Sequence, residues 1–176
     1  IYMNALFGYT GFVGSNILKF KKFDYLYRST NINDAKFKEF NQVYFCSLPG
    51  TKWKANKYPE EDNKILEQCI EVISTIKCNK FILISTIDVY EDINSGLDED
   101  YDLINSKPLH NYGRNRLLFE NFIKNKFNNY YIFRIPGLYG NGLKKNIIYD
   151  LINNHEINKI NIKNIYQWYN LDWLEE

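Results

Sequence analysis

The sequence predicts an α/β protein with a doubly wound parallel sheet and helices on both faces. Three observations predict it: short apolar runs recur along the chain, segments of helical periodicity separate them, and a three-glycine turn joins the first run to the first helix. Continuous apolar runs are typical of parallel strands, because helices cover both faces of such sheets. Alternating strands and helices imply right-handed crossovers. We expect residues 1–176 to form one domain.

The elements follow from these patterns in chain order. The predicted strands are residues 5–7, 25–27, 43–46, 81–85 and 131–135. Helices are predicted at residues 12–20, 34–40, 59–76, 112–126 and 145–152. The helix that begins at Pro59 has the clearest signal, because proline and three acidic residues occupy its first turn. We interpret residues 51–58 as a connection that packs Trp53, in preference to a segment that contacts a ligand phosphate.

The glycine turn reads Gly-x-x-Gly-x-x-Gly and lies between the first strand and the first helix. Such a turn directs backbone N–H groups and the positive end of a helix at one point, which suits a phosphate. The pattern is related to the dinucleotide-binding fingerprint. The alternative is a turn that uses glycine only for positive φ angles. We favour nucleotide binding, and the predicted cofactor-binding residues are Gly8, Thr10, Gly11, Phe12, Val13 and Gly14.

Residues that follow the other strands are further candidates, because doubly wound sheets bind ligands at the carboxyl ends of their strands. Arg28 stands where an acidic residue would favour NAD, and arginine can pair with the 2′-phosphate of NADP. We lean slightly towards NADP, and the alternative is a solvated strand-end arginine. Ser47 and Leu48 belong to a turn that can pass beneath an adenine and its ribose, or form an ordinary loop. Pro136 is a candidate cofactor contact.

A hydroxyl and a tyrosine-arginine pair form the predicted catalytic group. Thr86 ends the fourth strand, and Tyr112 and Arg116 follow on one helical face, one turn apart. A cation at this spacing can lower the pKa of the tyrosine and contact a ribose. With the Thr86 hydroxyl, the group suits proton transfer in alcohol and carbonyl chemistry. Taken alone, the Tyr112–Arg116 pair is more typical of a helix face with an extended surface arginine.

Together these motifs resemble the extended short-chain dehydrogenase/reductase family, the NAD-dependent epimerase/dehydratase group that acts on nucleotide sugars. The matching segments, in family order, are Gly8 to Gly14, Ser85-Thr86 before Tyr90, Tyr112, Arg134 to Gly140, and Tyr166 to Asp172. The resemblance implies a Rossmann fold that binds NAD or NADP, with the C-terminal substrate lobe reduced or absent. It also implies that Thr86 hydrogen-bonds a substrate hydroxyl and that Tyr112 is the general acid or base. Arg116 would fix the nicotinamide ribose, where the family normally has lysine.

Two functional classes remain open at this point. The first is an NAD(P)-dependent oxidoreductase, epimerase or dehydratase that acts on a nucleotide sugar or a similar hydroxyl-bearing metabolite. The second is a dinucleotide-binding module without turnover, either a sensor or a subunit of a larger assembly. Helices 60–77 and 112–126 have apolar residues on more than one face, and the resemblance implies a homodimer built on them. Alternatively, those residues contact loops of the same chain.

Composition excludes several other classes. The net charge is +1 with interspersed lysine and glutamate, so we expect no nucleic-acid partner. The cysteines, Cys46, Cys69 and Cys78, lack metal-ligand spacing, so we expect no metal and a reducing compartment. No apolar stretch reaches the length of a membrane span, and the N-terminus does not resemble a signal peptide. We therefore expect a cytoplasmic protein with no membrane partner.

Overall fold

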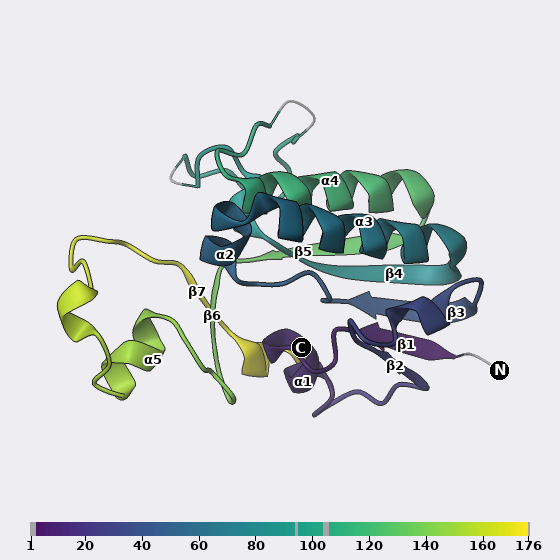
Figure 1. Ribbon diagram of the computed structural model, residues 1–176, viewed down its shortest axis with the longest axis horizontal. Coiled ribbons are helices and arrows are strands. Elements are labelled where there is room, and N and C mark those ends of the chain that lie inside the picture. The colour runs from purple at the N-terminus through teal and green to yellow at the C-terminus, as the bar shows by residue number, and fades with distance from the viewer. Residues whose placement is uncertain (1–2, 94, 104–105, 176) are drawn as a thin grey trace.

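The computed structural model describes residues 3–93, 95–103 and 106–175. A five-stranded parallel sheet with the order β2-β1-β3-β4-β5 forms its centre (Figure 1). The strands are β1 (Asn4–Phe7), β2 (Tyr25–Tyr27), β3 (Glu39–Phe45), β4 (Lys77–Thr86) and β5 (Tyr130–Ile135). The strand order reverses between β1 and β3, which defines the switch point where doubly wound sheets bind ligands.

Helices cover the sheet on both faces, which confirms the predicted fold class. Figure 1 shows α3 and α4 side by side above one face and α1 below the other, and the short α2 lies beside them at the left edge. The bounds are α1 (Phe12–Ile17), α2 (Lys52–Lys57), α3 (Pro59–Thr75) and α4 (Asn111–Lys126). Proline and acidic residues begin α3 as predicted, and the extended backbone of Ile76 ends it.

Two predicted elements were wrong. Residues 34–40 are not a helix: a short 3₁₀ helix, Ile32–Ala35, is followed by Phe37 in the left-handed region with φ 64°, and β3 then begins at Glu39. A six-stranded dinucleotide-binding sheet has a further strand on the outer side of β2. Residues 28–38, all of which are described, contain no strand, so β2 is the edge of this sheet. The first helix also ends earlier than predicted, at Ile17.

The second error concerns residues 51–58, which we expected to form a connecting loop. They contain α2, which packs against α3 and α4. Ala55 is the buried residue of this helix, whereas Trp53 is 63% exposed and does not pack. A helix of six residues has little intrinsic stability, so its form depends on contacts with its neighbours that local sequence does not contain.

Phenylalanine rings fill the core between the sheet and the pair α3–α4. Phe45 lies at the centre, and its ring centroid is 5.7 Å from that of Phe7, 6.0 Å from Phe81 and 4.8 Å from Phe119. All four side chains are fully buried. Phe7 and Phe45 are the last residues of β1 and β3, so the core holds both strand ends directly before the loops that follow them.

A buried ion pair joins β4, β5 and α4. Glu120 on α4 is fully buried and accepts a hydrogen bond from the Nη2 of Arg134 at 2.9 Å and another from the Ser85 hydroxyl at 2.5 Å. Arg134 also donates to the hydroxyl of Tyr90 at 3.1 Å. A buried charge requires such partners. The cluster therefore fixes the end of β4, where Thr86 follows Ser85.

The chain leaves the main sheet at Pro136. β6 (Gly137–Tyr139) pairs in parallel with β7 (Trp168–Asn170), and α5 (Ile147–Ile152) lies in the long excursion between them, at the left of Figure 1. The buried Asn16 of α1 donates to the carbonyl of Asn141 at 3.1 Å, which attaches this segment to the first helix. Among the described residues, no helix combines the length and apolar character needed to cross a membrane.

Candidate active site

The glycine turn folds tightly against the carboxyl ends of β1 and β3. Gly8 has φ +89°, and a Cβ atom there would lie 2.5 Å from the carbonyl oxygen of Cys46. A Cβ atom on Gly14 would lie 2.2 Å from the carbonyl oxygen of Gly8. Since real Cβ atoms do not approach oxygen so closely, both positions require glycine for close packing, and Gly8 also requires it for its backbone angle. The burial of Cys46 raises the pKa of its thiol to about 12, so it is not a nucleophile at neutral pH.

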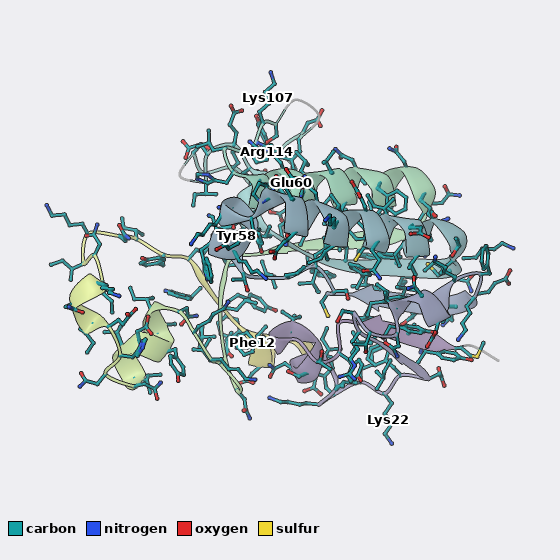
Figure 2. The ribbon with its side chains drawn as sticks, in the orientation of Figure 1. Phe12, Lys22, Tyr58, Glu60, Lys107 and Arg114 are labelled. Atoms are coloured by element: carbon teal, nitrogen blue, oxygen red, sulfur yellow. The ribbon has the colours of Figure 1, made fainter. Side chains whose placement is uncertain are left out.

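This turn presents an anion-binding arrangement of backbone groups. The N–H groups of Phe12, Val13 and Gly14 lie in the first turn of α1, where an α-helix offers no internal acceptor. Figure 2 marks Phe12 at this end of the helix, and Thr10 and Gly11 beside it are exposed. The first turn of α1 contains no acidic side chain that would occupy these groups. The positive end of the helix is thus open to a phosphate.

Two further predicted residues border the turn. The N–H of Gly8 donates to the carbonyl of Tyr27 at 2.8 Å, so Arg28, the next residue, lies beside the turn. Its side chain is exposed and donates from Nε to the Thr30 hydroxyl at 2.9 Å. Ser47 lies against Gly8, since a Cβ atom on that glycine would be 2.9 Å from the Ser47 Cα. Both residues therefore flank the switch point.

Leu48 and Pro136, the other two predicted cofactor contacts, have different surroundings. Leu48 packs against the main hydrophobic core and is only partly accessible. Pro136 is half-buried between β5 and β6, next to Ile135, which is the register partner of Thr86. Pro136 therefore lies near the carboxyl end of β4, whereas Leu48 anchors its loop.

Thr86, Tyr112 and Arg116 come together at the end of β4. The Arg116 guanidinium carbon lies 4.2 Å from the centroid of the Tyr112 ring, and the Thr86 hydroxyl is near enough to affect the pKa of Tyr112. Burial raises the pKa of Tyr112 above its ordinary value, although the Arg116 charge and the nearby Thr86 hydroxyl act to lower it. The Arg116 cation acts to lower the pKa of this tyrosine, as expected, but desolvation raises the pKa by more.

The Arg116 side chain is buried, not extended along the surface, and both terminal nitrogens have protein partners. Nη1 donates to the Asp62 carboxylate at 2.6 Å, and Nη2 donates to the carbonyl of Pro49. Asn115 also donates to Asp62, at 2.7 Å. The residue is only 4% exposed. Arg116 thus connects α4 to α3 and to the loop after β3, and a ribose contact would require it to exchange a partner.

Sequence reasoning missed Gly113, Asp88 and Lys52. A Cβ atom on Gly113 would lie 2.1 Å from the carbonyl oxygen of Asp88, so this glycine lets α4 approach the residues after β4. Asp88 accepts a hydrogen bond from the Thr86 hydroxyl at 3.1 Å and forms an ion pair with Lys52 of α2. A glycine inside a helix costs about 1 kcal/mol relative to alanine. The glycine within the predicted helix 112–126 was therefore the sequence signal that this helix approaches another segment closely.

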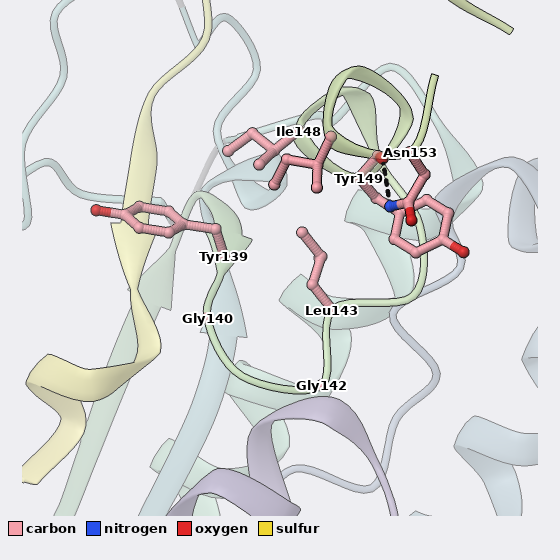
Figure 3. A pocket seen from close by; sticks show the side chains of 8 residues that line it. Tyr139, Gly140, Gly142, Leu143, Ile148, Tyr149 and Asn153 are labelled. Carbon is pink, nitrogen blue, oxygen red and sulfur yellow. Dashed lines mark hydrogen bonds between the residues drawn. The ribbon is translucent and has the colours of Figure 1, made fainter. Parts of the chain in front are cut away.

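An open hollow of about 420 Å³ lies between β6 and α5 (Figure 3). None of the predicted site residues lines it. Across the described residues, no cluster of His, Cys, Asp or Glu side chains could hold a metal ion. The lining residues are Tyr139, Gly140, Gly142, Leu143, Ile148, Tyr149, Ile152 and Asn153.

A parallel sheet with a glycine turn at its switch point is the architecture of dinucleotide-binding α/β proteins. Solved structures with this fold match the chain closely in shape. MoeE5 in complex with UDP-glucose and NAD has a TM-score of 0.70 and 17% identity, over 97% of this chain and 68% of that one. The UDP-N-acetylglucosamine 4-epimerase from Methanobrevibacter ruminantium M1, in complex with UDP-N-acetylmuramic acid, has a TM-score of 0.71 and 13% identity, over 99% and 70%.

The dTDP-4-dehydrorhamnose reductase from Bacillus anthracis str. Ames, in complex with NADP, is also similar. Its TM-score is 0.65 at 18% identity, over 87% of this chain and 59% of that one. The chain matches no protein-family model and no sequence among the curated proteins. At these identities the likeness establishes the fold, and it confirms the Rossmann-like architecture expected from the sequence.

Proposed function

We propose that the protein binds a nicotinamide dinucleotide at the carboxyl edge of its sheet and acts as an NAD(P)-dependent oxidoreductase, epimerase or dehydratase. The substrate would be a nucleotide sugar or another hydroxyl-bearing metabolite. The observation that carries the proposal is the position of the glycine turn at the switch point, at the same edge as the Thr86–Tyr112 pair. The similar structures support it, since they contain NAD, NADP and UDP-sugars.

Each residue has a proposed role that follows from its chemistry. The N–H groups of Phe12, Val13 and Gly14 would bind the pyrophosphate, with Ser47 beside it, and Arg28 would pair with a 2′-phosphate. Thr86 would orient the substrate hydroxyl and Tyr112 would transfer its proton, while the bound dinucleotide supplies hydride chemistry. We propose that Arg116 acts mainly by stacking on Tyr112 and by its charge, because its polar atoms already have partners.

A titration of the purified protein tests this proposal. Isothermal calorimetry with NADPH, NADH and UDP-glucose should detect binding of at least one dinucleotide, and mixing with nucleotide sugars should then produce hydride exchange. Binding without exchange on any nucleotide sugar would favour the second candidate, a non-catalytic dinucleotide-binding module. The ion pair that occupies Arg116 is the observation that keeps this candidate open. Failure to bind either dinucleotide would refute both.

The proposed NADP preference makes a prediction about Arg28. Replacing Arg28 with alanine should weaken NADPH binding by about tenfold, the effect of losing one charge-assisted hydrogen-bond pair, and leave NADH binding unchanged. Lys22→Ala is the matched control, because Lys22 is an exposed cation beyond the end of α1 and Figure 2 shows it far from Phe12. Equal weakening for both cofactors would show that Arg28 does not recognise the 2′-phosphate.

A homodimer built on α3 and α4 is also proposed. Ile65, Ile70 and Phe122 are half-buried against the core of their own chain, which accounts for part of the apolar excess. Leu118 on α4 remains 57% exposed and is available for a partner helix. Light scattering should give twice the chain mass of 21.1 kDa, and Leu118→Lys should shift it towards the monomer. A monomeric wild-type protein at micromolar concentration would reject the dimer.

A further inference from the structure

The short helix α2 contacts both halves of the proposed catalytic group. Lys52, its first residue, forms an ion pair with Asp88, which lies two positions after Thr86. Asn56, about one helical turn further along α2, accepts a hydrogen bond from the backbone N–H of Tyr112 at 2.9 Å. Residues four positions apart lie on the same face of a helix. One face of α2 therefore reaches both the segment that follows β4 and the start of α4.

The contact between Asn56 and Tyr112 is a helix cap that comes from outside α4. His110 is the N-cap residue of α4, and its side chain makes no capping hydrogen bond. Tyr112 lies in the first turn of α4, where a backbone N–H has no acceptor within its own helix. The side-chain oxygen of Asn56 accepts this N–H instead. Asn111 adds a second contact, because its side-chain amide donates to the carbonyl of Ala55 at 3.4 Å. α2 thus holds the backbone that carries the tyrosine ring.

At the other end of α2, Lys52 orients the Thr86 hydroxyl through Asp88. One oxygen of the Asp88 carboxylate accepts a hydrogen bond from the Lys52 ammonium, and the other accepts one from the Thr86 hydroxyl at 3.1 Å. The backbone N–H of Asp88 donates to the Thr86 oxygen at 3.2 Å. A hydroxyl has one proton and two lone pairs. One lone pair of Thr86 therefore remains to accept a hydrogen bond from a substrate hydroxyl.

Close packing keeps the two halves of the group side by side. A Cβ atom on Gly113 would lie 2.1 Å from the carbonyl oxygen of Asp88, so the first turn of α4 lies directly against the residues that follow β4. Such a contact limits how closely the two segments approach, but it does not fix how α4 slides or turns against its neighbour. Hydrogen bonds have preferred directions and do restrict such movement. Lys52 and Asn56 supply these bonds from one helix.

We propose that α2 is the positioning element of the catalytic group: Lys52 and Asn56 together set the position of the Thr86 hydroxyl relative to the Tyr112 side chain. The inference rests on the proposed function. Both residues act through another residue, Lys52 through Asp88 and Asn56 through the backbone of Tyr112, so they are positioning residues. Precise placement matters for the rate, because a misplacement of about 1 Å can cost about 10²-fold. The segment 51–58, whose sequence indicated only a connection, acquires a function in this way.

The first test measures the cap without measuring activity. In Asn56→Ala the Tyr112 N–H loses its acceptor, so its amide hydrogen exchange, followed by NMR, should become about five- to tenfold faster. Asn56→Asp keeps an acceptor oxygen at the same place, and a carboxylate is favourable at the N-terminus of a helix. Exchange at Tyr112 should therefore stay slow in Asn56→Asp. Equal exchange rates in the wild type and in Asn56→Ala would show that Asn56 does not cap α4.

The second test is kinetic and uses hydride exchange on the nucleotide sugar that the wild type turns over. We expect kcat of Asn56→Ala to fall about 10- to 10²-fold, with KM and dinucleotide affinity unchanged. Asn56→Asp should restore most of the rate, and Lys52→Met should lower kcat about tenfold. In a Tyr112→Phe background, Asn56→Ala should cause no further loss, because no hydroxyl remains to be positioned.

Each variant has a matched control. Lys54→Met controls for Lys52→Met, since Lys54 lies on the same helix but pairs with Glu61 at the surface. Asn129→Ala controls for Asn56→Ala, because the Asn129 side chain also bonds to the backbone, at 2.9 Å, but at the amino edge of the sheet. Both controls should keep the wild-type kcat. Thermal melts of all variants verify folding.

The outcomes separate this inference from the proposed function. If Asn56→Ala or Lys52→Met kept the full wild-type kcat while Tyr112→Phe was inactive, α2 would not be the positioning element, and the proposed function would stand. A further loss from Asn56→Ala in the Tyr112→Phe background would also overturn the inference, because Asn56 would then act by another route. Full activity of Tyr112→Phe, or no hydride exchange by the wild type on any nucleotide sugar, would instead overturn the proposed function and the inference with it.

Discussion

Replacing Tyr112 with phenylalanine is expected to reduce turnover by about 10²- to 10⁴-fold, the usual contribution of a positioned general acid or base. The substitution removes one oxygen from a half-buried ring that stacks against Arg116, so the packing between them should survive. Dinucleotide binding should therefore remain close to the wild-type value, because the glycine turn on the opposite side of the switch point is unchanged. Stopped-flow detection of reduced cofactor measures the rate, and calorimetry measures binding.

The control for this variant is Tyr130→Phe. Tyr130 begins β5 at the amino end of the strand, away from the edge where Thr86 ends β4. Its loss of a hydroxyl should leave turnover unchanged. Unchanged turnover in Tyr112→Phe would remove Tyr112 from the proposed catalytic group. A parallel loss of dinucleotide affinity would instead indicate that the hydroxyl serves binding.

The second large effect is expected at Glu120. Replacing Glu120 with alanine should lower the free energy of unfolding by about 3–5 kcal/mol, because it leaves the Arg134 charge buried without its partner and opens a cavity beside Ser85. Urea denaturation followed by circular dichroism measures the change. Glu71→Ala is the matched control: its pair with Lys36 has the same chemistry, at 2.6 Å, but Glu71 is largely exposed. A surface pair contributes about 0–1 kcal/mol.

A double substitution provides a second control for the Glu120–Arg134 pair. Replacing Glu120 and Arg134 together with leucine and methionine should recover part of the lost stability, because no unpaired charge then remains. If Glu120→Ala cost no more than Glu71→Ala, the buried pair would not be a main support of the β4–β5–α4 junction. Since Ser85 and Thr86 are adjacent at that junction, a loosened pair should also weaken the alignment of the proposed catalytic group.

The strands were predictable because their signal is local. Continuous apolar runs must be buried on both faces, and each of the five predicted runs corresponds to a strand of the sheet. The helix at Pro59 was predictable for a similar reason, since its cap signals and its periodicity occur within one segment. Residues 34–40 and 51–58 lacked such signals. Their structure is set by packing against α3 and its neighbours, and tertiary contacts override weak local preference there.

The candidate site also has parts that the sequence predicts and parts that it does not. The glycine turn and the Tyr112–Arg116 spacing are local patterns, and the topology of a parallel sheet brings their ends to one edge. The partners of Arg116 were not predictable, because Asp62 and Pro49 are 54 and 67 positions away along the chain. The same applies to Lys52 and Asp88, which are 36 positions apart and meet only when α2 folds beside the end of β4.

The sequence by itself determined the sheet, the glycine turn and the identity of the groups that could transfer a proton, because each depends on residues a few positions apart. The tertiary structure alone decided which cation faces which carboxylate: it pairs Arg116 with Asp62, and Lys52 with Asp88. Desolvation and charge act through space and depend on packing between elements distant in sequence. The raised pKa of Tyr112 is their combined result, so it could not be predicted from the spacing of residues along the chain.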